Sequence, residues 1–308
     1  MKIYSGNAHP ALAKKIADHC KTTLGDLEIN RFPDGEIFVK IKDNIRGEDA
    51  FVVQPICYPP NENFMELLII MDAMRRASAE RITAVLPFYG YARQDRKDQP
   101  RVPITAKLVA NLLVAAGASR ILTMDLHAQQ IQGFFDIPVD HLYAAPILAR
   151  RLIDRNFPRP VIVSPDTGGV KMAQAYAHFL ECGLAIVAKE RRGPSEVDAF
   201  SLVGSVEDKT AIMVDDLSTT AGTLCSASRL LKENGALDVV AAVSHAPLVP
   251  QGLERLKKSS ISELFVTDSV PLQHDGTFPV TTLSVSDLLG EAILRIHEGR
   301  SVSSLFKL

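Results

Sequence analysis

Two adjacent carboxylates, Asp215 and Asp216, follow a short apolar run and precede a small turn rich in hydroxyl groups. A helix-like pattern follows the turn, and the N-terminus of a helix offers free N–H groups and a favourable dipole to an anion. The carboxylates can accept hydrogen bonds from sugar hydroxyls or hold a metal ion. The stretch therefore predicts a sugar-phosphate site, with a merely capped turn as the alternative. The candidate phosphate-binding residues are Thr219, Thr220, Ala221, Gly222 and Thr223.

A second motif, residues 31–36, precedes an expected strand and has the parts to bind a nucleobase. Phe32 can stack on an aromatic base, and Asp34 and Glu36 can accept hydrogen bonds from amino or hydroxyl groups. Gly35 permits close backbone approach. A Pro-Asp-Gly sequence is also a common tight turn, so a purely structural role is the competing interpretation.

A third motif follows an expected buried strand and forms a loop dense in cations, from residue 87 to residue 98. Arg93, with Arg96 and Lys97, suits a polyphosphate, because guanidinium groups make bidentate contacts to phosphate oxygens. Gln94 and Asp98 add an amide and a carboxylate to the same loop. The alternative is a solvated charged loop.

Two further strand ends carry groups that can coordinate a cation. His127 lies two residues after Asp125, and Asp166 opens the Gly-rich turn that contains Gly168 and Gly169. These residue types suit Mg²⁺ or a nucleotide phosphate. A structural histidine and an Asp that caps a helix are the competing interpretations.

A basic run, Lys189-Glu190-Arg191-Arg192, follows another expected strand and leads into Gly193 and Pro194. Lysine and arginine on a closing lid can neutralise charge that develops on a transferring phosphoryl group. Lys189 and Arg191 are therefore candidate catalytic residues, and an exposed basic hairpin is the alternative.

Short apolar runs alternate with helix-period segments along the chain, which predicts an α/β fold with mainly parallel sheets flanked by helices. Ligands in such folds bind beyond the carboxyl ends of the strands, where every motif except residues 31–36 falls. Expected strands span residues 3–4, 36–41, 51–54, 82–86, 120–124, 161–163, 185–188, 211–214, 239–243 and 263–266. Expected helices span residues 10–22, 63–79, 104–116, 146–155, 169–178, 221–234, 250–258 and 286–297.

The 308 residues suit two domains, with a boundary expected near Pro146. A net charge of −2 argues against a nucleic-acid partner held by bulk charge. The four cysteines are widely spaced and are expected to be reduced, as in a cytoplasmic protein. The first residues read as a strand rather than a signal peptide. No apolar run approaches the roughly 18–20 residues of a membrane span, so no membrane association is expected.

The chain resembles, essentially end to end, the ribose-phosphate pyrophosphokinases of the common bacterial and mammalian class. The Asp-Asp turn alone is shared with all type I phosphoribosyltransferases, whereas the Ala92-Arg93-Gln94-Asp95 loop and the tail are specific to this family. The segments that carry the resemblance are 32–36, 91–97, 125–128, 164–166, Lys189 with Arg191, 215–223 and 295–306.

The resemblance implies two type I phosphoribosyltransferase-like domains, residues 1–146 and 147–294, with a tail of about residues 295–308 packing on the first. It implies Mg²⁺-dependent transfer of the pyrophosphoryl group of ATP to the anomeric hydroxyl of ribose 5-phosphate, without a covalent enzyme intermediate. It also implies a homo-hexamer, often regulated by phosphate and ADP.

Residue roles carry over from the family by position. ATP would bind in the first domain, Mg²⁺ near His127 and Asp166, and ribose 5-phosphate on the Asp-Asp turn together with Arg191. Lys189 and Arg191 would stabilise the transition state. The implied ATP ligands are Phe32, Asp34, Gly35, Glu36, Arg93, Gln94 and Asp98, and the implied regulatory residues are Ser301, Ser303 and Phe306.

Two positions depart from the family pattern, and two other functions stay open. Thr219 stands where the family usually has a third Asp, and Glu190 interrupts the basic run of the lid. One alternative is a phosphoribosyltransferase, in which Phe32, Arg93 and Gln94 would have no purpose. The other is a non-catalytic regulatory homologue, which should have lost residues of the lid or of the metal site.

Overall fold

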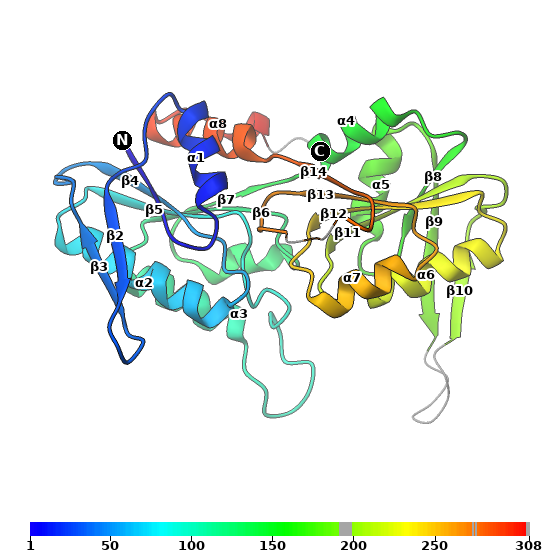
Figure 1. Ribbon diagram of the computed structural model, residues 1–308, viewed down its shortest axis with the longest axis horizontal. Coiled ribbons are helices and arrows are strands. Elements are labelled where there is room, and N and C mark those ends of the chain that lie inside the picture. Colours follow the sequence, from blue (N-terminus) through cyan, green and yellow to red (C-terminus); the bar gives the residue numbers. More distant parts are fainter. Residues whose placement is uncertain (191–198, 273, 275, 306–308) are drawn as a thin grey trace. The chain divides into compact units, whose positions relative to one another are not determined.

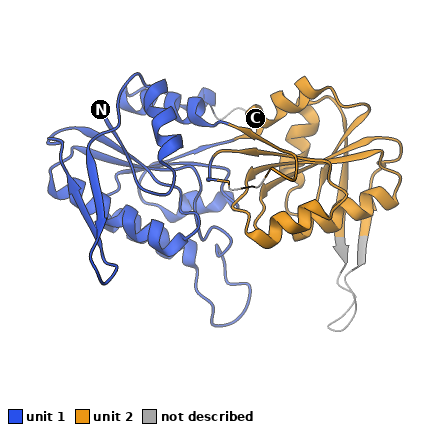
Figure 2. Cartoon of the chain, viewed as in Figure 1, with its two compact units in different colours: residues 1–143, 269–271, 284–307 blue, residues 144–268, 272–283, 308 orange. Residues whose placement is uncertain are grey.

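Parallel strands alternate with helices along the chain in the computed structural model, which describes residues 1–190, 199–272, 274 and 276–305 (Figure 1). The α/β class expected from the sequence is therefore confirmed. The chain divides into two compact units (Figure 2). Unit 1 contains residues 1–143, 269–271 and the described residues from 284 onward, and unit 2 contains residues 144–268 and the described residues of 272–283.

Unit 1 is built on a five-stranded parallel sheet with the strand order β1-β4-β5-β6-β7. Helices α1 and α8 cover one face of this sheet, and α2 and α3 cover the other (Figure 1). A separate antiparallel pair, β2 and β3, forms a hairpin. The elements are β1 (Lys2–Ser5), α1 (Pro10–His19), β2 (Leu27–Arg31), β3 (Ile37–Ile41), β4 (Asp49–Val53), α2 (Pro60–Arg76), β5 (Arg81–Leu86), α3 (Thr105–Ala116), β6 (Arg120–Met124), the 3-10 helix η1 (Gln129–Phe134), β7 (Val139–Leu142), α8 (Ser286–His297) and the 3-10 helix η2 (Ser303–Leu305).

Unit 2 contains a seven-stranded sheet with the strand order β10-β9-β8-β11-β12-β13-β14. Its described strands pair in parallel except for β9 with β10. Helices α4 and α5 lie on one face, and α6 and α7 lie on the other (Figure 1). The elements are α4 (Ala145–Arg155), β8 (Pro160–Ser164), α5 (Val170–Phe179), β9 (Gly183–Glu190), β10 (Ala199–Val203), β11 (Thr210–Leu217), α6 (Gly222–Glu233), β12 (Asp238–His245), α7 (Pro250–Lys257), β13 (Glu263–Thr267) and β14 (Val280–Leu283).

Every helix expected from the sequence is present, but four strands were missed. Three of these, β7, β10 and β14, lie at sheet edges, and the fourth, β2, belongs to the separate hairpin. Central parallel strands are buried on both faces and read as continuous apolar runs, as β4 does with all five residues buried. Edge strands mix polar and apolar residues, so their pattern is weaker.

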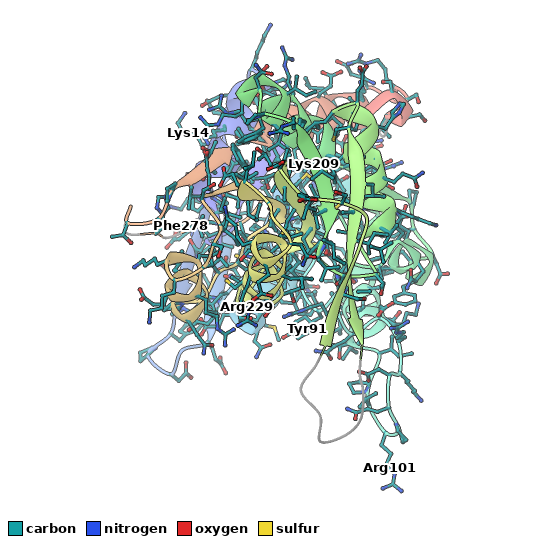
Figure 3. The ribbon with its side chains drawn as sticks, turned by 90° about the vertical axis from the view of Figure 1, so that its right-hand side faces the viewer. Lys14, Tyr91, Arg101, Lys209, Arg229 and Phe278 are labelled. Atoms are coloured by element: carbon teal, nitrogen blue, oxygen red, sulfur yellow. The ribbon has the colours of Figure 1, made fainter. Side chains whose placement is uncertain are left out.

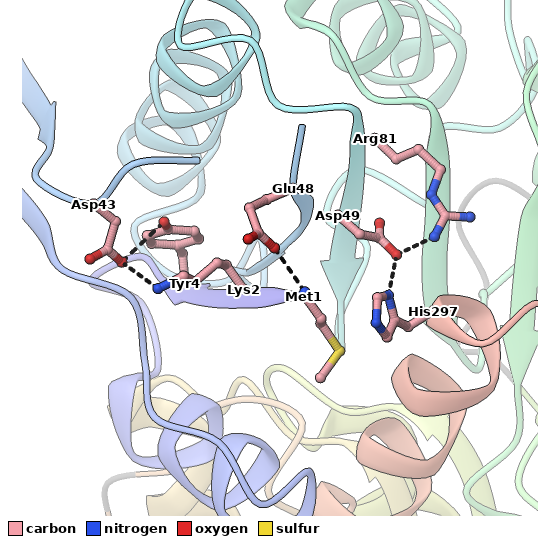
Figure 4. Close-up of polar contacts among 8 residues, drawn as sticks. All are labelled: Met1, Lys2, Tyr4, Asp43, Glu48, Asp49, Arg81 and His297. Carbon is pink, nitrogen blue, oxygen red and sulfur yellow. Dashed lines mark hydrogen bonds and ion pairs between the residues drawn. The ribbon is translucent and has the colours of Figure 1, made fainter. Parts of the chain in front are cut away.

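The N-terminal strand and the C-terminal helix both pack into unit 1. The amino group of Met1 lies 2.9 Å from the Glu48 carboxylate, and the Tyr4 hydroxyl donates to Asp43 at 3.2 Å (Figure 4). Helix α8 packs on α1 at Gly290, where a Cβ atom would lie 2.6 Å from the ring of His19. A glycine is therefore required for the close approach of these two helices.

Candidate active site

The Asp215–Asp216 pair lies at the carboxyl end of β11, inside the strand rather than after it. The strand runs to Leu217, three residues beyond the expected end, and Asp215 pairs with Val243 of β12. The backbone N–H of Asp216 donates to Oδ1 of Asp215 at 2.9 Å. Burial at the carboxyl end of this central strand raises the pKa of Asp215 to about 8, and the negative charges of Asp216 and Asp166 add to the shift. A cation or a sugar hydroxyl that approaches these carboxylates would offset their repulsion.

The turn that follows the carboxylates presents the N-terminus of α6. Ala221 adopts a left-handed conformation, with φ of 53°, and no side chain caps the helix, which begins at Gly222 rather than at residue 221 as expected. The first backbone N–H groups of the helix are thus available to an anion. Oγ1 of Thr219 is buried without a hydrogen-bond partner among the described residues. An unsatisfied hydroxyl beside free N–H groups fits a phosphate better than an empty capped turn.

Helix α7 packs against this turn and supports it, and nothing in the sequence predicted this contact. The N–H of Val249 donates to the carbonyl of Thr219 at 3.0 Å, and Nη1 of Arg255 donates to the carbonyl of Thr220 at 3.2 Å. A Cβ atom on Gly252 would lie 2.8 Å from the Thr219 carbonyl oxygen. The turn is therefore held at three points by a helix that follows it in the sequence.

Asp166 caps the turn before α5. Its Oδ1 accepts hydrogen bonds from the N–H groups of Gly168 at 2.8 Å and Gly169 at 3.0 Å. This is the capping role that competed with metal binding in the sequence interpretation. The carboxylate is nevertheless exposed, and its charge contributes to the raised pKa of Asp215, so the two acids belong to one electrostatic site within unit 2.

The candidate nucleobase motif forms the exposed tip of the β2–β3 hairpin in unit 1. Gly35 has φ of 95°, its N–H donates to the Phe32 carbonyl at 2.8 Å, and the N–H of Glu36 donates to Oδ1 of Asp34 at 3.2 Å. The tight turn predicted as the alternative is thus present. Phe32 is 49% exposed, and its ring packs on that of Phe38 in a T-shaped arrangement with 5.8 Å between centroids, so the residue remains partly accessible from solvent.

The cationic loop links β5 to α3 and extends from unit 1, with Arg101 pointing outward at its far end (Figure 3). Gln94 anchors the loop to the start of α3, since its carbonyl accepts from the N–H of Ala106 at 3.1 Å. Arg93 and Asp98 lie on the loop with exposed side chains. Their exposure suits contact with a ligand and also suits a solvated loop.

The histidine candidate for metal binding lies in a constrained turn after β6. Asp125 is buried with φ of 39°, and its N–H donates to the Leu142 carbonyl at 3.0 Å. The N–H of Leu126 donates to Nε2 of the buried His141 at 2.9 Å. This fixes the backbone that carries the exposed His127, and the sequence gave no sign that His141 would be the supporting residue.

Within the described part of the chain, no three His, Cys, Asp or Glu side chains converge as a ready metal centre. His127 lies in unit 1 and Asp166 in unit 2, and each is described within its own unit. The carboxylate oxygens around Asp215 are nevertheless the donor type that Mg²⁺ prefers. The donor chemistry therefore fits Mg²⁺, and the assignment of His127 and Asp166 stays a prediction.

The remaining candidates lie at the lid and in the tail. Lys189 belongs to β9, where its backbone pairs with Phe200 of β10, and Arg191 and Phe306 lie outside the described residues. In the tail, the Ser301 hydroxyl lies 3.1 Å from that of Ser303. The Ser301 carbonyl accepts from Nη1 of Arg295 at 3.3 Å, so the described tail is tied to α8.

Comparison with known proteins adds independent information. Residues 1–117 match the family described as the N-terminal domain of ribose phosphate pyrophosphokinase, and residues 191–307 match the phosphoribosyl synthetase-associated domain. The ribose-phosphate pyrophosphokinase of Gloeobacter violaceus is 49% identical over 100% of this chain and 93% of its own length. That of Bordetella parapertussis is 50% identical over 99% of both chains.

A solved structure is similar along nearly the whole chain. The phosphoribosylpyrophosphate synthetase of Mycobacterium smegmatis aligns with a TM-score of 0.92 and 42% identity, over 97% of this chain and 99% of its own. None of the described helices has the length and apolar composition of a membrane span.

The family models, the curated relatives and the solved structure all indicate the same enzyme family. The chain belongs to the ribose-phosphate pyrophosphokinase family.

Proposed function

We propose that this protein transfers the pyrophosphoryl group of ATP to the anomeric hydroxyl of ribose 5-phosphate, forming phosphoribosyl pyrophosphate and AMP for nucleotide biosynthesis. Full-length similarity to ribose-phosphate pyrophosphokinases supports the reaction. The single structural observation that carries the proposal is the Asp215–Asp216 pair beside the uncapped N-terminus of α6. The two carboxylates can accept hydrogen bonds from the hydroxyl groups of a sugar, and the N-terminus of the helix can bind its phosphate group.

Ribose 5-phosphate is assigned to residues 147–294. The ring hydroxyls would donate to Asp215 and Asp216, and the 5-phosphate would accept hydrogen bonds from the turn of residues 219–223. Because Gly252 and Arg255 hold this turn in place, little rearrangement is needed when the phosphate binds. Thr219, which replaces a family Asp, removes one negative charge from the position that faces the phosphate.

ATP is assigned to residues 1–146, with the adenine ring stacked on Phe32 and hydrogen-bonded around Asp34, Gly35 and Glu36. Arg93, Gln94 and Asp98 would orient the rest of the nucleotide. Mg²⁺, held near His127 and Asp166, would neutralise charge on the phosphates when bound. The tail of about residues 295–308 is assigned to the same domain.

Lys189 and Arg191 would act on the transferring group itself. The anomeric oxygen of the sugar forms a bond to the β-phosphorus of ATP, and the bond from that phosphorus to the oxygen of AMP breaks. Cations at this point neutralise the charge that develops on the departing AMP oxygen, so that catalysis rests on positioning and charge. We extend the proposal to a homo-hexamer in the cytoplasm, and to a regulatory role for Ser301, Ser303 and Phe306, by likeness to the family.

The test is to incubate the purified protein with Mg²⁺, ribose 5-phosphate and ATP labelled at the β-phosphate, and to separate the products by chromatography. We expect AMP to form only when the sugar phosphate is present, with the label in the sugar product. ADP as the nucleotide product would mean γ-phosphoryl transfer and would refute the proposal. Nucleotide binding without turnover would favour the regulatory homologue. As a check on the sugar site, Asp216→Ala should weaken ribose 5-phosphate binding and leave the KM for ATP unchanged.

A further inference from the structure

A pocket lies between α6 and α7 in unit 2, apart from the Asp215–Asp216 carboxylates. Its volume is about 290 Å³, which is roughly ten times the 30 Å³ or so that one water molecule occupies in the liquid. Three of the seven side chains that line it are cationic, three are serines, and none is acidic. They are Cys225, Ser226, Arg229, Arg255, Lys258, Ser259 and Ser260.

The three cations of the pocket have no carboxylate partner within the part of the chain that the structure describes. Among the described residues, neither Arg229, Arg255 nor Lys258 forms an ion pair with a carboxylate, whereas the neighbouring Lys257 lies 2.8 Å from Glu254. Like charges that converge on one pocket repel each other, and an anion between them would remove that repulsion.

Local helix electrostatics accounts for only part of this arrangement. Lys258 caps the C-terminus of α7, where the helix dipole favours a cation. Arg229 lies in the interior of α6, and it is labelled in Figure 3. The helix dipole does not favour a cation at this interior position. The cluster of cations therefore forms only because side chains from α6 and from the end of α7 line the same pocket.

The hydroxyl groups of the pocket are suited to complement the cations. Ser259 is fixed at the end of α7, since it donates to the Leu256 carbonyl at 2.7 Å and accepts from the N–H of Ile261 at 3.2 Å. It therefore forms a rigid wall. Ser226 and Ser260 line the same pocket and bring two further hydroxyl donors.

We propose that this pocket binds a small phosphate-bearing anion, held by Arg229, Arg255 and Lys258 and by the hydroxyls of Ser226 and Ser260. Guanidinium groups match phosphate oxygens in bidentate geometry, and serine hydroxyls commonly complete such sites. The volume accommodates a phosphate group together with a small organic substituent.

Arg255 belongs both to the pocket and to the support of the sugar-phosphate turn. Its Nη1 donates to the Thr220 carbonyl, and a Cβ atom on Gly222 would lie 3.3 Å from the same nitrogen. An anion in the pocket would compete with the Thr220 carbonyl for this guanidinium. The pocket is therefore placed to change the sugar-phosphate turn, and Arg255 is left unaltered in the test below.

The test is a calorimetric titration of the full chain with inorganic phosphate at constant ionic strength. The variant is Arg229→Gln with Lys258→Gln, and its matched control is Lys232→Gln with Lys257→Gln. The control removes the same charge from α6 and from the C-terminal end of α7, but outside the pocket. We expect the affinity of one phosphate site to fall by about tenfold in the variant, as two cation contacts are lost, and to stay unchanged in the control. Phosphate binding at the Asp-Asp turn should persist in both.

Cys225 reports where the phosphate binds. We expect phosphate to slow alkylation of Cys225 by a neutral reagent, measured by mass spectrometry at matched ionic strength with sodium chloride. Cys182, which is also half-buried but does not line the pocket, is the internal control. Glycerol 3-phosphate in place of phosphate distinguishes an ester ligand, if it binds more tightly, from the free anion. Equal phosphate binding by the variant and its control, or no protection of Cys225, would overturn the proposal. Loss of catalysis alone would not, because neither readout depends on turnover.

Discussion

Nδ1 of His297, in the last turn of the C-terminal helix α8, lies 2.9 Å from Oδ2 of the buried Asp49 at the start of β4 (Figure 4). The same oxygen accepts from the guanidinium of Arg81 on β5. One buried carboxylate thus joins two strands of the sheet to a helix from the far end of the chain. This contact fixes where α8 packs in unit 1.

Removing this shared carboxylate should destabilise unit 1. The side chain of Asp49 is 5% exposed, while those of Arg81 and His297 are 46% and 38% exposed. Asp49→Asn is therefore expected to cost about 1–3 kcal/mol, less than the loss of a fully buried pair. Urea unfolding measures the change. As a control, Asp18→Asn removes the exposed pair with Lys14 and should cost less than about 0.5 kcal/mol. An equal decrease in the free energy of unfolding for the two variants would show that the contacts of Asp49 do not stabilise unit 1.

Gly252→Ala should displace the sugar-phosphate turn. Alanine favours a helix by about 1 kcal/mol over glycine, but its Cβ would lie 2.8 Å from the Thr219 carbonyl oxygen, and such overpacking costs about 1–3 kcal/mol. We expect a net loss of stability and a higher KM for ribose 5-phosphate, with the KM for ATP unchanged. Gly133→Ala, where no atom lies within 4 Å of the added Cβ, is the matched control. A stabilised Gly252→Ala variant with normal kinetics would show that the close approach is unimportant.

The raised pKa of Asp215 predicts how stability depends on pH. In the unfolded chain this carboxyl loses its proton near its usual pKa of 3.8, whereas in the folded protein it retains the proton up to about 8. Between these values the folded state binds more protons, so stability should fall as the pH rises. Asp215→Asn should flatten this slope and be the more stable protein at pH 8, by on the order of 1 kcal/mol. Thermal unfolding without ligands at several pH values measures this, with Asp154→Asn on α4 as the charge control. A slope that Asp215→Asn leaves intact would assign the effect to another group.

Lys189→Ala should reduce kcat while leaving ATP affinity nearly unchanged. The proposed contact forms mainly in the transition state, and loss of one such electrostatic contact typically lowers kcat by about 100- to 1,000-fold. Steady-state kinetics, together with ATP binding measured separately, tests the assignment. Lys209→Ala, which removes another cation of unit 2, should retain normal kcat. A normal kcat for Lys189→Ala would exclude this lysine from the mechanism.

The sequence by itself determined the α/β class, the α-helices of the described residues and the central strands, because hydrophobic periodicity and apolar runs are local properties. The short 3-10 helices η1 and η2 were not expected. It also located the Asp215–Asp216 turn and the family motifs, since each lies in one continuous segment. The sequence did not predict the strands at sheet edges, such as β7 and β14, because their hydrophobic pattern is weak and their burial depends on the neighbouring elements.

Only the tertiary structure decided which residues support these segments. The pKa of Asp215 is raised mainly by burial, and the charges of Asp216 and of Asp166, at the end of a different strand, add to the shift. The sugar-phosphate turn depends on Gly252 and Arg255 of α7. His297 contacts Asp49, although 248 positions separate them in the sequence. Such contacts follow from how the elements pack, and packing joins residues whose sequence separation carries no pattern.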